Sequence, residues 1–284
     1  MAEAQPPALM RWPDLLSRPH PTGAIRIAYG SDPLQHGQLW LPAGKGPHRT
    51  VLMIHGGCWQ SDIADASIMD WIAADLAKRG YAVWNIEYRG VDRPGGGYPG
   101  TFQDIAAATD LLRGIGPRYG LRTDRIVAVG HSAGGHLAFW AAGRHRLPQG
   151  SALRSAKPLP IVAAIGIGAL PDLPMARDLP GNDCGVGSVP RLVGPVTAAR
   201  PDPFVDTSAD RLLPIGAGLT LVTGAADRIA PPSIAVSFVA KARARRQAVR
   251  SIEVPAQGHV ELIAPETPAW AATVRAIEAA FAAR

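Results

Sequence analysis

Short apolar runs and helix-length amphipathic segments alternate along most of this 284-residue chain. Apolar, β-branched runs predict strands, and segments with apolar residues three and four positions apart predict helices. The predicted strands are residues 24–28, 38–41, 50–54, 81–87, 125–129, 161–167, 219–223 and 250–254. The predicted helices are residues 66–78, 101–112, 134–142, 233–244 and 267–282. This alternation is typical of an α/β fold with a mostly parallel, eight-stranded sheet and helices on both faces.

The first two predicted strands differ from the later ones. They are separated by polar turn residues, so we expect them to form an antiparallel entry into the sheet. The later runs are nearly all apolar, as strands of a parallel sheet buried on both faces should be. We see no internal repeat and no second domain, so residues 1–284 are expected to form one domain.

Residues 171–216 interrupt the alternation. They are rich in Pro, Asp and Gly and show no sustained periodicity. So long an irregular stretch in a compact domain is usually functional or mobile. We expect an excursion that folds over the sheet edge and shapes a substrate pocket; the alternative is a loose surface connection.

Composition and charge narrow the function. Apolar residues make up 47% of the chain and charged residues 18%, which suits a buried core and argues against disorder. The net charge is +6, and the most basic stretch, residues 241–250, follows apolar positions that predict the buried side of a helix. No aromatic residues alternate with the basic ones, and no nucleic-acid motif is present. We therefore expect no nucleic-acid partner and only a mild preference for anionic substrates.

Other features bear on location and cofactors. No apolar run approaches the roughly 20 residues that a membrane span needs, and residues 1–11 lack the apolar core of a signal peptide. We therefore expect a cytoplasmic protein without a membrane partner. Cys58 and Cys184 are too few for a disulfide framework, and no Cys/His cluster has zinc-site spacing. We expect neither a metal nor a cofactor, and the sequence makes no prediction about oligomeric state.

The most informative segment is the strand-to-helix junction at residues 125–136. It contains the sequence GHSAG from Gly130 to Gly134, a G-x-S-x-G pattern between a predicted strand and a predicted helix. In a nucleophile elbow the serine lies on a sharp, strained turn, and side chains at the flanking glycines would collide with neighbouring backbone. The pattern predicts Ser132 as a catalytic nucleophile.

A serine nucleophile needs a base and a carboxylate that orients the base. Asp227 lies in the loop after the predicted strand 219–223, and His259 lies in the loop after 250–254. The order serine, acid, histidine matches that of enzymes with this elbow. Rival acids lie in the interrupted segment without a strand before them, and they are Asp202, Asp206 and Asp210. We predict Asp227 as the acid and His259 as the base.

A second glycine-rich turn follows the strand at 50–54. The sequence His55-Gly-Gly-Cys-Trp59 would bring backbone N–H groups close to the nucleophile. The tetrahedral intermediate of acyl transfer carries a negative oxygen that needs such donors. We predict an oxyanion hole made by the N–H groups of Gly57 and Cys58, joined by the N–H of Ala133.

The side chains of this turn have separate expected roles. His55 is expected to orient the turn rather than to act as a general base. No downstream segment supplies Cys58 with a base, so it is not expected to be a nucleophile. Trp59 is expected to line the substrate site, and a packing role is the alternative.

Charged residues between 87 and 104 are given structural roles. Glu87 and Arg89 lie at a strand end and are expected to pair with each other or with nearby charges. Thr101 and Asp104 have the spacing of a helix-capping box, so we expect Asp104 to cap the helix.

Taken together, several motifs resemble one family of α/β-hydrolases. They are HGGCW at 55–59, EYR at 87–89, GGGYPGTFQD at 95–104, GHSAGGHLA at 130–138 and GHVELIAPETPAW at 258–270. The sequence resembles the kynurenine formamidases (arylformamidases) and their esterase-like relatives over residues 35–284. Residues 171–216 match that family least.

The resemblance implies an α/β-hydrolase fold and a serine hydrolase with Ser132, Asp227 and His259 as its triad, and the absence of a metal-ligand cluster predicts that the enzyme needs no metal. The implied substrate is a small carboxylic ester or an aryl formamide, cleaved through an acyl-enzyme on Ser132. An alternative of another class is a non-catalytic scaffold of the same fold that binds a small ligand or a protein partner.

Overall fold

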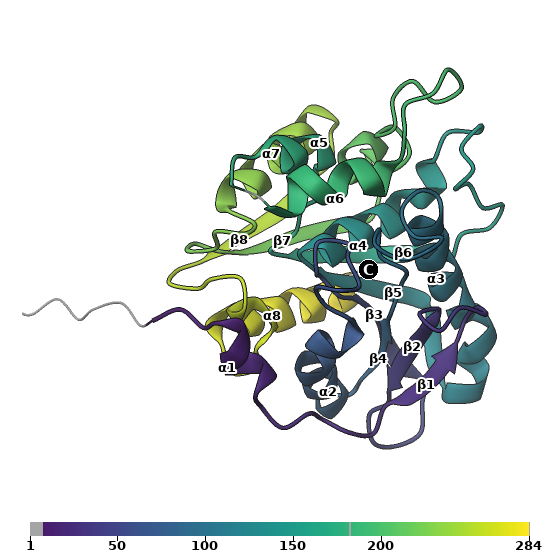
Figure 1. The fold of residues 1–284 in the computed structure, drawn as a ribbon. Helices are drawn as coiled ribbons and strands as arrows, with labels where there is room; N and C mark the ends of the chain where they lie inside the picture. The colour runs from purple at the N-terminus through teal and green to yellow at the C-terminus, as the bar shows by residue number, and fades with distance from the viewer. Residues whose placement is uncertain (1–7, 182, 284) are drawn as a thin grey trace, which may run out of the picture.

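The computed structural model describes residues 8–181 and 183–283, and these form an eight-stranded sheet flanked by helices (Figure 1). The strands are β1 (Ile25–Ala28), β2 (His36–Trp40), β3 (His48–Ile54), β4 (Tyr81–Ile86), β5 (Leu121–His131), β6 (Ile161–Ile167), β7 (Gly218–Gly224) and β8 (Val249–Val254). Their order across the sheet is β1-β2-β4-β3-β5-β6-β7-β8. β1 pairs antiparallel with β2 and β2 with β4, whereas β3 to β8 are parallel. The predicted fold class and the antiparallel entry are confirmed.

Eight α-helices and four short 3-10 helices are assigned within the described residues. The α-helices are α1 (Trp12–Leu16), α2 (Asp70–Lys78), α3 (Gly100–Tyr119), α4 (Ala133–Gly143), α5 (Leu173–Asp178), α6 (Asp183–Val193), α7 (Pro232–Ala244) and α8 (Pro268–Ala282). The 3-10 helices are η1 (Ala66–Met69), η2 (Arg144–Arg146), η3 (Ala209–Leu212) and η4 (Glu261–Ile263).

The sheet separates two hydrophobic cores, because successive side chains of a strand point to opposite faces. On β3, Val51 and Met53 belong to the core that includes residues of α1, α2 and α8. Leu52 and Ile54 belong to the core that includes residues of α3, α4 and α7. All four side chains are fully buried. Double-sided burial explains why the central strands are nearly uninterrupted apolar runs.

The sequence predicted that the segment 171–216 is irregular throughout. This prediction is wrong, because the segment contains α5, α6 and η3. α5 has only six residues and begins where the Asp172 carboxylate accepts a hydrogen bond from the N–H of Met175. α6 contains two glycines and Pro190, which are weak helix formers. Neither helix therefore gives a clear periodic signal. In Figure 1 both lie beside α7 over the sheet.

Polar contacts anchor the segment 171–216 to the rest of the fold. Asp206, 2% exposed, pairs with Arg200 at 2.6 Å and accepts a hydrogen bond from Ser151 at 2.8 Å. Lys241 of α7 pairs with Asp172 at 2.5 Å and with Asp210 at 3.5 Å. The segment is therefore packed against the domain body and is not a loose surface connection.

The predicted helix at 101–112 is also longer than expected, because α3 continues to Tyr119. The prediction stopped early because Gly114, Gly116 and Pro117 disfavour a helix. The helix ends at Gly120, which has a φ of 63° and whose N–H donates to the carbonyl of Gly116. A left-handed glycine at this position is a common helix terminator. No helix among the described residues is long and apolar enough to cross a bilayer.

Candidate active site

Ser132 lies on the turn between β5 and α4 with φ 54° and ψ −120°, a backbone conformation that residues with a side chain rarely adopt. A Cβ added to Gly130 would lie 2.1 Å from the carbonyl oxygen of Gly134. A Cβ added to Gly134 would lie 2.2 Å from the carbonyl oxygen of Ile54 on β3. The two glycines are therefore required by the close approach of strand and helix, as the motif predicts.

Asp227 and His259 form the hydrogen-bonded pair expected of an acid and a base. His259 Nδ1 lies 2.7 Å from Asp227 Oδ2. The other carboxylate oxygen of Asp227 accepts the N–H groups of Ile229 at 2.9 Å and Ala230 at 2.8 Å. Both partners are buried. They come together because β7 and β8 are parallel neighbours whose carboxyl ends meet at one edge of the sheet.

Ser132 and His259 border the same cavity, which has a volume of about 430 Å³. Its wall is largely apolar and includes Trp12, Leu16, Ile63, Ile68 and Ile229. The Ser132 hydroxyl makes no hydrogen bond to any described residue, so it is free to meet a ligand. A larger hollow of about 790 Å³ lies at the amino ends of β6 and β7, and no triad residue borders it.

The rival acids have other partners. Asp206 is bound to Arg200, and Asp210 accepts a hydrogen bond from Ser208 in addition to its contact with Lys241. Asp202 accepts a hydrogen bond from the N–H of Phe204 within its own turn. The structure therefore brings Asp227, and none of these three, to a histidine.

Gly168, at the end of β6, is a site residue that the sequence analysis missed. Its φ is +54°, and a Cβ added there would lie 3.0 Å from His259 Nδ1 and 3.1 Å from Asp227 Oδ2. The nearest atom would be Leu262 Cδ1 at 2.8 Å, so a side chain at this position would crowd both Leu262 and the acid–histidine pair. Its sequence context, a glycine after a buried strand, is shared by many turns, so this role is evident only from tertiary contacts.

His131 is a second residue whose role was not predicted. Its ring lies 4.4 Å from that of His259, centroid to centroid, and its Nε2 donates to the His259 carbonyl at 3.2 Å. Burial, together with the nearby His259, lowers the pKa of His131 well below its usual range, so the ring is neutral. His131 thus supports the backbone of His259 without adding charge.

The predicted oxyanion loop lies directly beside the nucleophile. A Cβ added to Gly56 would lie 3.0 Å from the Cβ of Ser132. Three successive residues have positive φ, namely Gly57 at 98°, Cys58 at 52° and Trp59 at 57°. None of the hydrogen bonds among described residues uses the N–H groups of Gly57, Cys58 or Ala133. These three donors are therefore free for a ligand oxygen.

Trp59 lies behind this loop, not on the cavity wall. Its side chain is fully buried, and its Nε1–H donates to His136 Nδ1 at 3.3 Å. His136 Nε2 in turn donates to the carbonyl of Thr207 at 2.7 Å. Burial lowers the pKa of His136 to about 4, so the ring is neutral, as this hydrogen-bond pattern requires. Trp59 therefore has the packing role that the sequence offered as the alternative.

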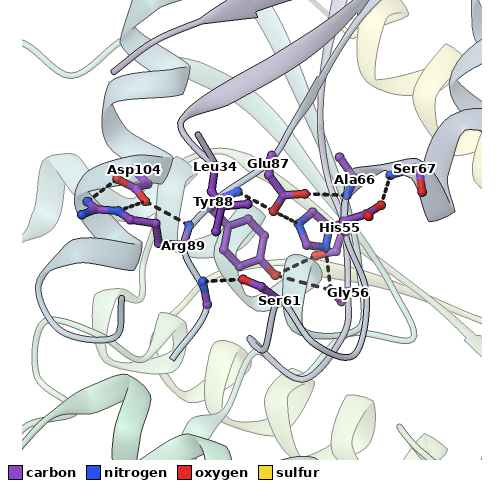
Figure 2. Close-up of polar contacts among 12 residues, drawn as sticks. Leu34, His55, Gly56, Ser61, Ala66, Ser67, Glu87, Tyr88, Arg89 and Asp104 are labelled. Carbon is purple, nitrogen blue, oxygen red and sulfur yellow. Dashed lines mark hydrogen bonds and ion pairs between the residues drawn. The ribbon is translucent and has the colours of Figure 1, made fainter. Parts of the chain in front are cut away.

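His55 and Glu87 form a buried pair beneath the oxyanion loop (Figure 2). His55 Nε2 lies 2.9 Å from Glu87 Oε1, and His55 Nδ1 lies 2.7 Å from the carbonyl oxygen of Gly56. Both ring nitrogens thus face acceptors, so both must carry protons. The Tyr88 ring stacks on His55, and its hydroxyl donates to the His55 carbonyl at 3.1 Å. The side chain of His55 orients the turn, as expected.

The charges of this pair stabilise each other. Burial alone lowers the pKa of His55, but the Glu87 carboxylate and the Gly56 carbonyl more than offset it, so the pKa is raised. Burial alone raises the pKa of Glu87, but His55 and the N–H groups of Ala66 and Tyr88 hold it below its usual value. The pair is therefore an imidazolium and a carboxylate between about pH 4.5 and 6.5.

Arg89 pairs with Asp104 rather than with Glu87. Two guanidinium nitrogens of Arg89 lie 2.8 and 2.7 Å from the Asp104 oxygens, and the Arg89 N–H also donates to Asp104 at 3.0 Å. The expectation that Asp104 caps α3 is wrong, because Asp104 lies within the helix and its carboxylate is already used by Arg89. Figure 2 shows this pair next to the His55 network.

The two cysteines are joined. Cys58 of the oxyanion loop and Cys184 of α6 form a disulfide, with their Cα atoms 4.8 Å apart. Cys58 therefore has no free thiol, whereas its N–H remains available. Two cysteines do not make a framework, but the sequence analysis did not foresee that they would meet across 126 residues. No cluster of three or more His, Cys, Asp or Glu side chains in the described part of the chain could hold a metal ion.

The strand order, the strained serine turn and the acid–histidine pair define the α/β-hydrolase fold, and comparisons with known proteins agree. A family model described as BD-FAE matches residues 38–156, which contain the oxyanion loop and the elbow. Esterase B from Lactobacillus Rhamnosis (HN001) has a TM-score of 0.77 at 22% sequence identity, covering 92% of this chain and 84% of that structure.

Sequence relatives include two enzymes. Esterase LipC of Mycobacterium tuberculosis is 28% identical over 268 residues, which cover 88% of this chain and 65% of LipC. Kynurenine formamidase avaC of Aspergillus versicolor is 34% identical over 132 residues, or 43% of this chain and 44% of avaC. The chain thus spans less than two thirds of either relative. These similarities confirm the resemblance to esterase-like α/β-hydrolases.

The first prediction concerns Gly168. We expect Gly168→Ala to lower kcat at least tenfold, because its Cβ would press on His259 and Asp227. Steady-state hydrolysis of a neutral ester measures this. Gly216→Ala is the matched control, since Gly216 has φ +83° with no atom near its Cβ position. The control should lose only the roughly 1 kcal/mol typical of backbone strain and keep its kcat. Equal kcat values for both variants would remove Gly168 from the site.

The second prediction concerns Glu87. Glu87→Ala leaves a buried imidazole without its carboxylate and should cost about 3–5 kcal/mol, measured by urea unfolding. His55 has a raised pKa, so its contribution to the free energy of unfolding is complete below about pH 6.5, its ordinary pKa, and is lost as pH rises through the folded-state pKa. Glu87 has a lowered pKa, so its contribution to the free energy of unfolding is complete above about pH 4.5, its ordinary pKa, and is lost as pH falls through the folded-state pKa.

The stability difference between wild type and Glu87→Ala should therefore be largest between about pH 4.5 and 6.5. Glu87→Gln is the control, because its amide can donate to a neutral His55 and should cost less. A difference that stays flat across this range and beyond it would contradict the assigned charges.

Proposed function

We propose that this chain is a serine hydrolase that cleaves a small carboxylic ester or an aryl formamide through an acyl-enzyme on Ser132. One observation carries the proposal. His259, which is paired with Asp227, and the strained Ser132 border a single cavity, beside three backbone N–H groups for which the described residues show no partner. The similarity to LipC and avaC supports the same reaction class.

In the proposed mechanism each residue has one role. Ser132 attacks the substrate carbonyl while His259 Nε2 takes the hydroxyl proton. Asp227 accepts the Nδ1–H of His259 and so keeps Nε2 free to act as the base. The negative oxygen of the tetrahedral intermediate accepts hydrogen bonds from the N–H groups of Gly57, Cys58 and Ala133.

The second half of the reaction reverses these roles. His259 gives its proton to the leaving alcohol or amine, which departs as the carbonyl re-forms on Ser132. A water molecule then attacks the acyl-enzyme, again with His259 as base, and releases the acid. For a formamide the released acid is formate, and for an ester it is the corresponding carboxylic acid.

The cavity wall favours a substrate with an apolar body. Trp12 and four aliphatic side chains line it, and the indole of Trp12 lies 6.4 Å from the His259 ring. Arg228 is the one residue with a permanently charged side chain among the described residues that line the cavity. It is exposed, and no ion pair of Arg228 is found among the described residues. An aryl or short alkyl ester fits such a wall, as does an aryl formamide with an anionic substituent.

The domain organisation, partners and location belong to the same proposal. We propose one domain in which the segment 171–216 forms part of the pocket, and a small-molecule substrate as the ligand. The cytoplasmic location stays a prediction that fractionation of the native host would check. The disulfide is of a kind found mainly in oxidising compartments, so an extracytoplasmic location is the outcome to test against.

The third prediction tests the nucleophile. Ser132→Ala should lower kcat by about 10⁴-fold or more, because the hydroxyl forms the covalent intermediate. A fluorophosphonate probe should label the wild type stoichiometrically and should not label this variant. Ser31→Ala, an exposed serine far along the chain, is the control and should be labelled normally. Wild-type protein that binds small esters but is neither labelled nor active would favour a non-catalytic scaffold.

The fourth prediction tests the substrate. N-formylkynurenine and aryl esters of acetate and butyrate should be hydrolysed in a reaction that Ser132→Ala abolishes. The ratio of the kcat/KM values, measured in the same buffer, distinguishes a formamidase from an esterase. Turnover of neither class by folded wild-type protein would contradict the proposed substrates.

A further inference from the structure

The Cys58–Cys184 disulfide connects two walls of the catalytic cavity. Cys58 lies in the oxyanion loop, and Cys184 lies near the start of α6. Both residues border the cavity that contains Ser132 and His259, as does Gly181 just before α6. The disulfide therefore lies at the site itself, where it can affect the geometry of the cavity as well as the stability of the fold.

The loop on one side of the bond is strained. Cys58 and Trp59 both have the left-handed φ values that residues with a Cβ rarely adopt. Such a conformation persists only where surrounding contacts enforce it. Trp59 is held by His136 and by the hydrogen bond from the N–H of Val91 to its carbonyl at 2.7 Å. For the side chain of Cys58, the contact that plays this part is the disulfide.

The helix on the other side is held mainly farther along. Gln60 Nε2 donates to Ser188 Oγ at 2.9 Å, and the Arg191 guanidinium donates to the Val91 carbonyl at 2.6 Å. Val189 and Leu192 are fully buried in the core. At the cavity end of α6, the disulfide is the link to the oxyanion loop that the described residues show.

We propose that the Cys58–Cys184 disulfide is a positioning bond of the active site, which holds the Cys58 N–H in the oxyanion hole and fixes the α6 wall of the cavity. Hydrolysis by this chain therefore depends on the oxidised state of the two cysteines. The inference rests on the proposed function, since it concerns the same site. Neither cysteine reacts with the substrate; both act through the position of the Cys58 backbone.

Reduction of the bond is a defined step. A thiolate of dithiothreitol attacks one sulfur, the Cys58–Cys184 bond breaks, and a mixed disulfide forms. The second thiol of dithiothreitol then attacks this mixed disulfide, which frees the protein thiol, and dithiothreitol leaves as its cyclic disulfide. Two electrons pass from the dithiol to the protein, which gains two protons as two thiols. After dithiothreitol has been removed, oxidised glutathione would reverse the change, because it accepts the two electrons and leaves as two molecules of reduced glutathione.

The fifth prediction compares oxidised and reduced protein. Reduction should lower kcat/KM for a neutral aryl ester at least tenfold, mainly through kcat, because a displaced N–H weakens stabilisation of the transition state. Re-oxidation should restore the activity. Cys184→Ser should show the same loss without reduction, and re-oxidation should not restore it. Removal of one oxyanion donor typically costs about 10²–10³ in kcat, so a loss between about 10 and 10³ is expected.

Controls separate positioning from overall stability. The Cys58→Ser/Cys184→Ser double variant should have the low activity of the reduced protein and no response to dithiothreitol. Circular dichroism and thermal unfolding should show the reduced wild type folded at the assay temperature. The proposal is overturned if reduction lowers the melting temperature while kcat stays unchanged. It is equally overturned if activity falls only together with tertiary structure, or if mass spectrometry of the alkylated native protein finds two free thiols.

The same experiment distinguishes this proposal from the proposed function. Oxidised wild type that neither hydrolyses an ester nor takes up the fluorophosphonate probe at Ser132 would contradict the function itself. Oxidised wild type that is active and labelled, with unchanged kcat after reduction, would contradict only the role of the disulfide.

Discussion

The close approach of backbone segments around Ser132 is the constraint on which the site depends. The strand β5, the helix α4 and the oxyanion loop meet so tightly that a Cβ at Gly130 or Gly134 would overlap a carbonyl group. Gly56 and Gly168 border the same space, beside Ser132 and beside the acid–histidine pair. Four glycines from three segments thus allow Ser132, His259 and the loop at residues 55–59 to converge on one cavity.

Two ion pairs lie near this space, and each fixes a segment of backbone. His55 and Glu87 hold the oxyanion loop from below, with the imidazolium satisfied by a carboxylate and a carbonyl. Arg89 and Asp104 connect the end of β4 with α3. Because an isolated buried charge is costly, loss of one partner would affect the loop to which the other is attached. The site therefore rests on ion pairs that take no direct part in the proposed chemistry.

The segment 171–216 contributes residues to the cavity that Ser132 and His259 border. Gly181, just before α6, and Cys184 of α6 form part of the cavity wall, and the contacts of the segment with Lys241, Gln60 and Cys58 hold it in place. The disulfide joins this late segment to the first glycine-rich turn. Catalytic geometry and the shape of the pocket are consequently linked, since one loop contributes to both.

The sequence by itself determined the succession of the eight strands and of α2, α3, α4, α7 and α8, because double-sided burial requires apolar runs and the crossovers require amphipathic helices. It also led to the prediction of Ser132, Asp227 and His259 as a triad, since each follows a predicted strand with a recognisable turn. The roles of Gly168 and His131 were missed, because they depend on contacts across the sheet. Asp104 was expected to cap α3, but its carboxylate connects that helix to Arg89. Trp59, Cys58 and Cys184 were assigned from local context. Only the tertiary structure decided that the indole packs inward and that the two thiols meet across 126 residues, because proximity between distant segments leaves no periodic signal in the chain.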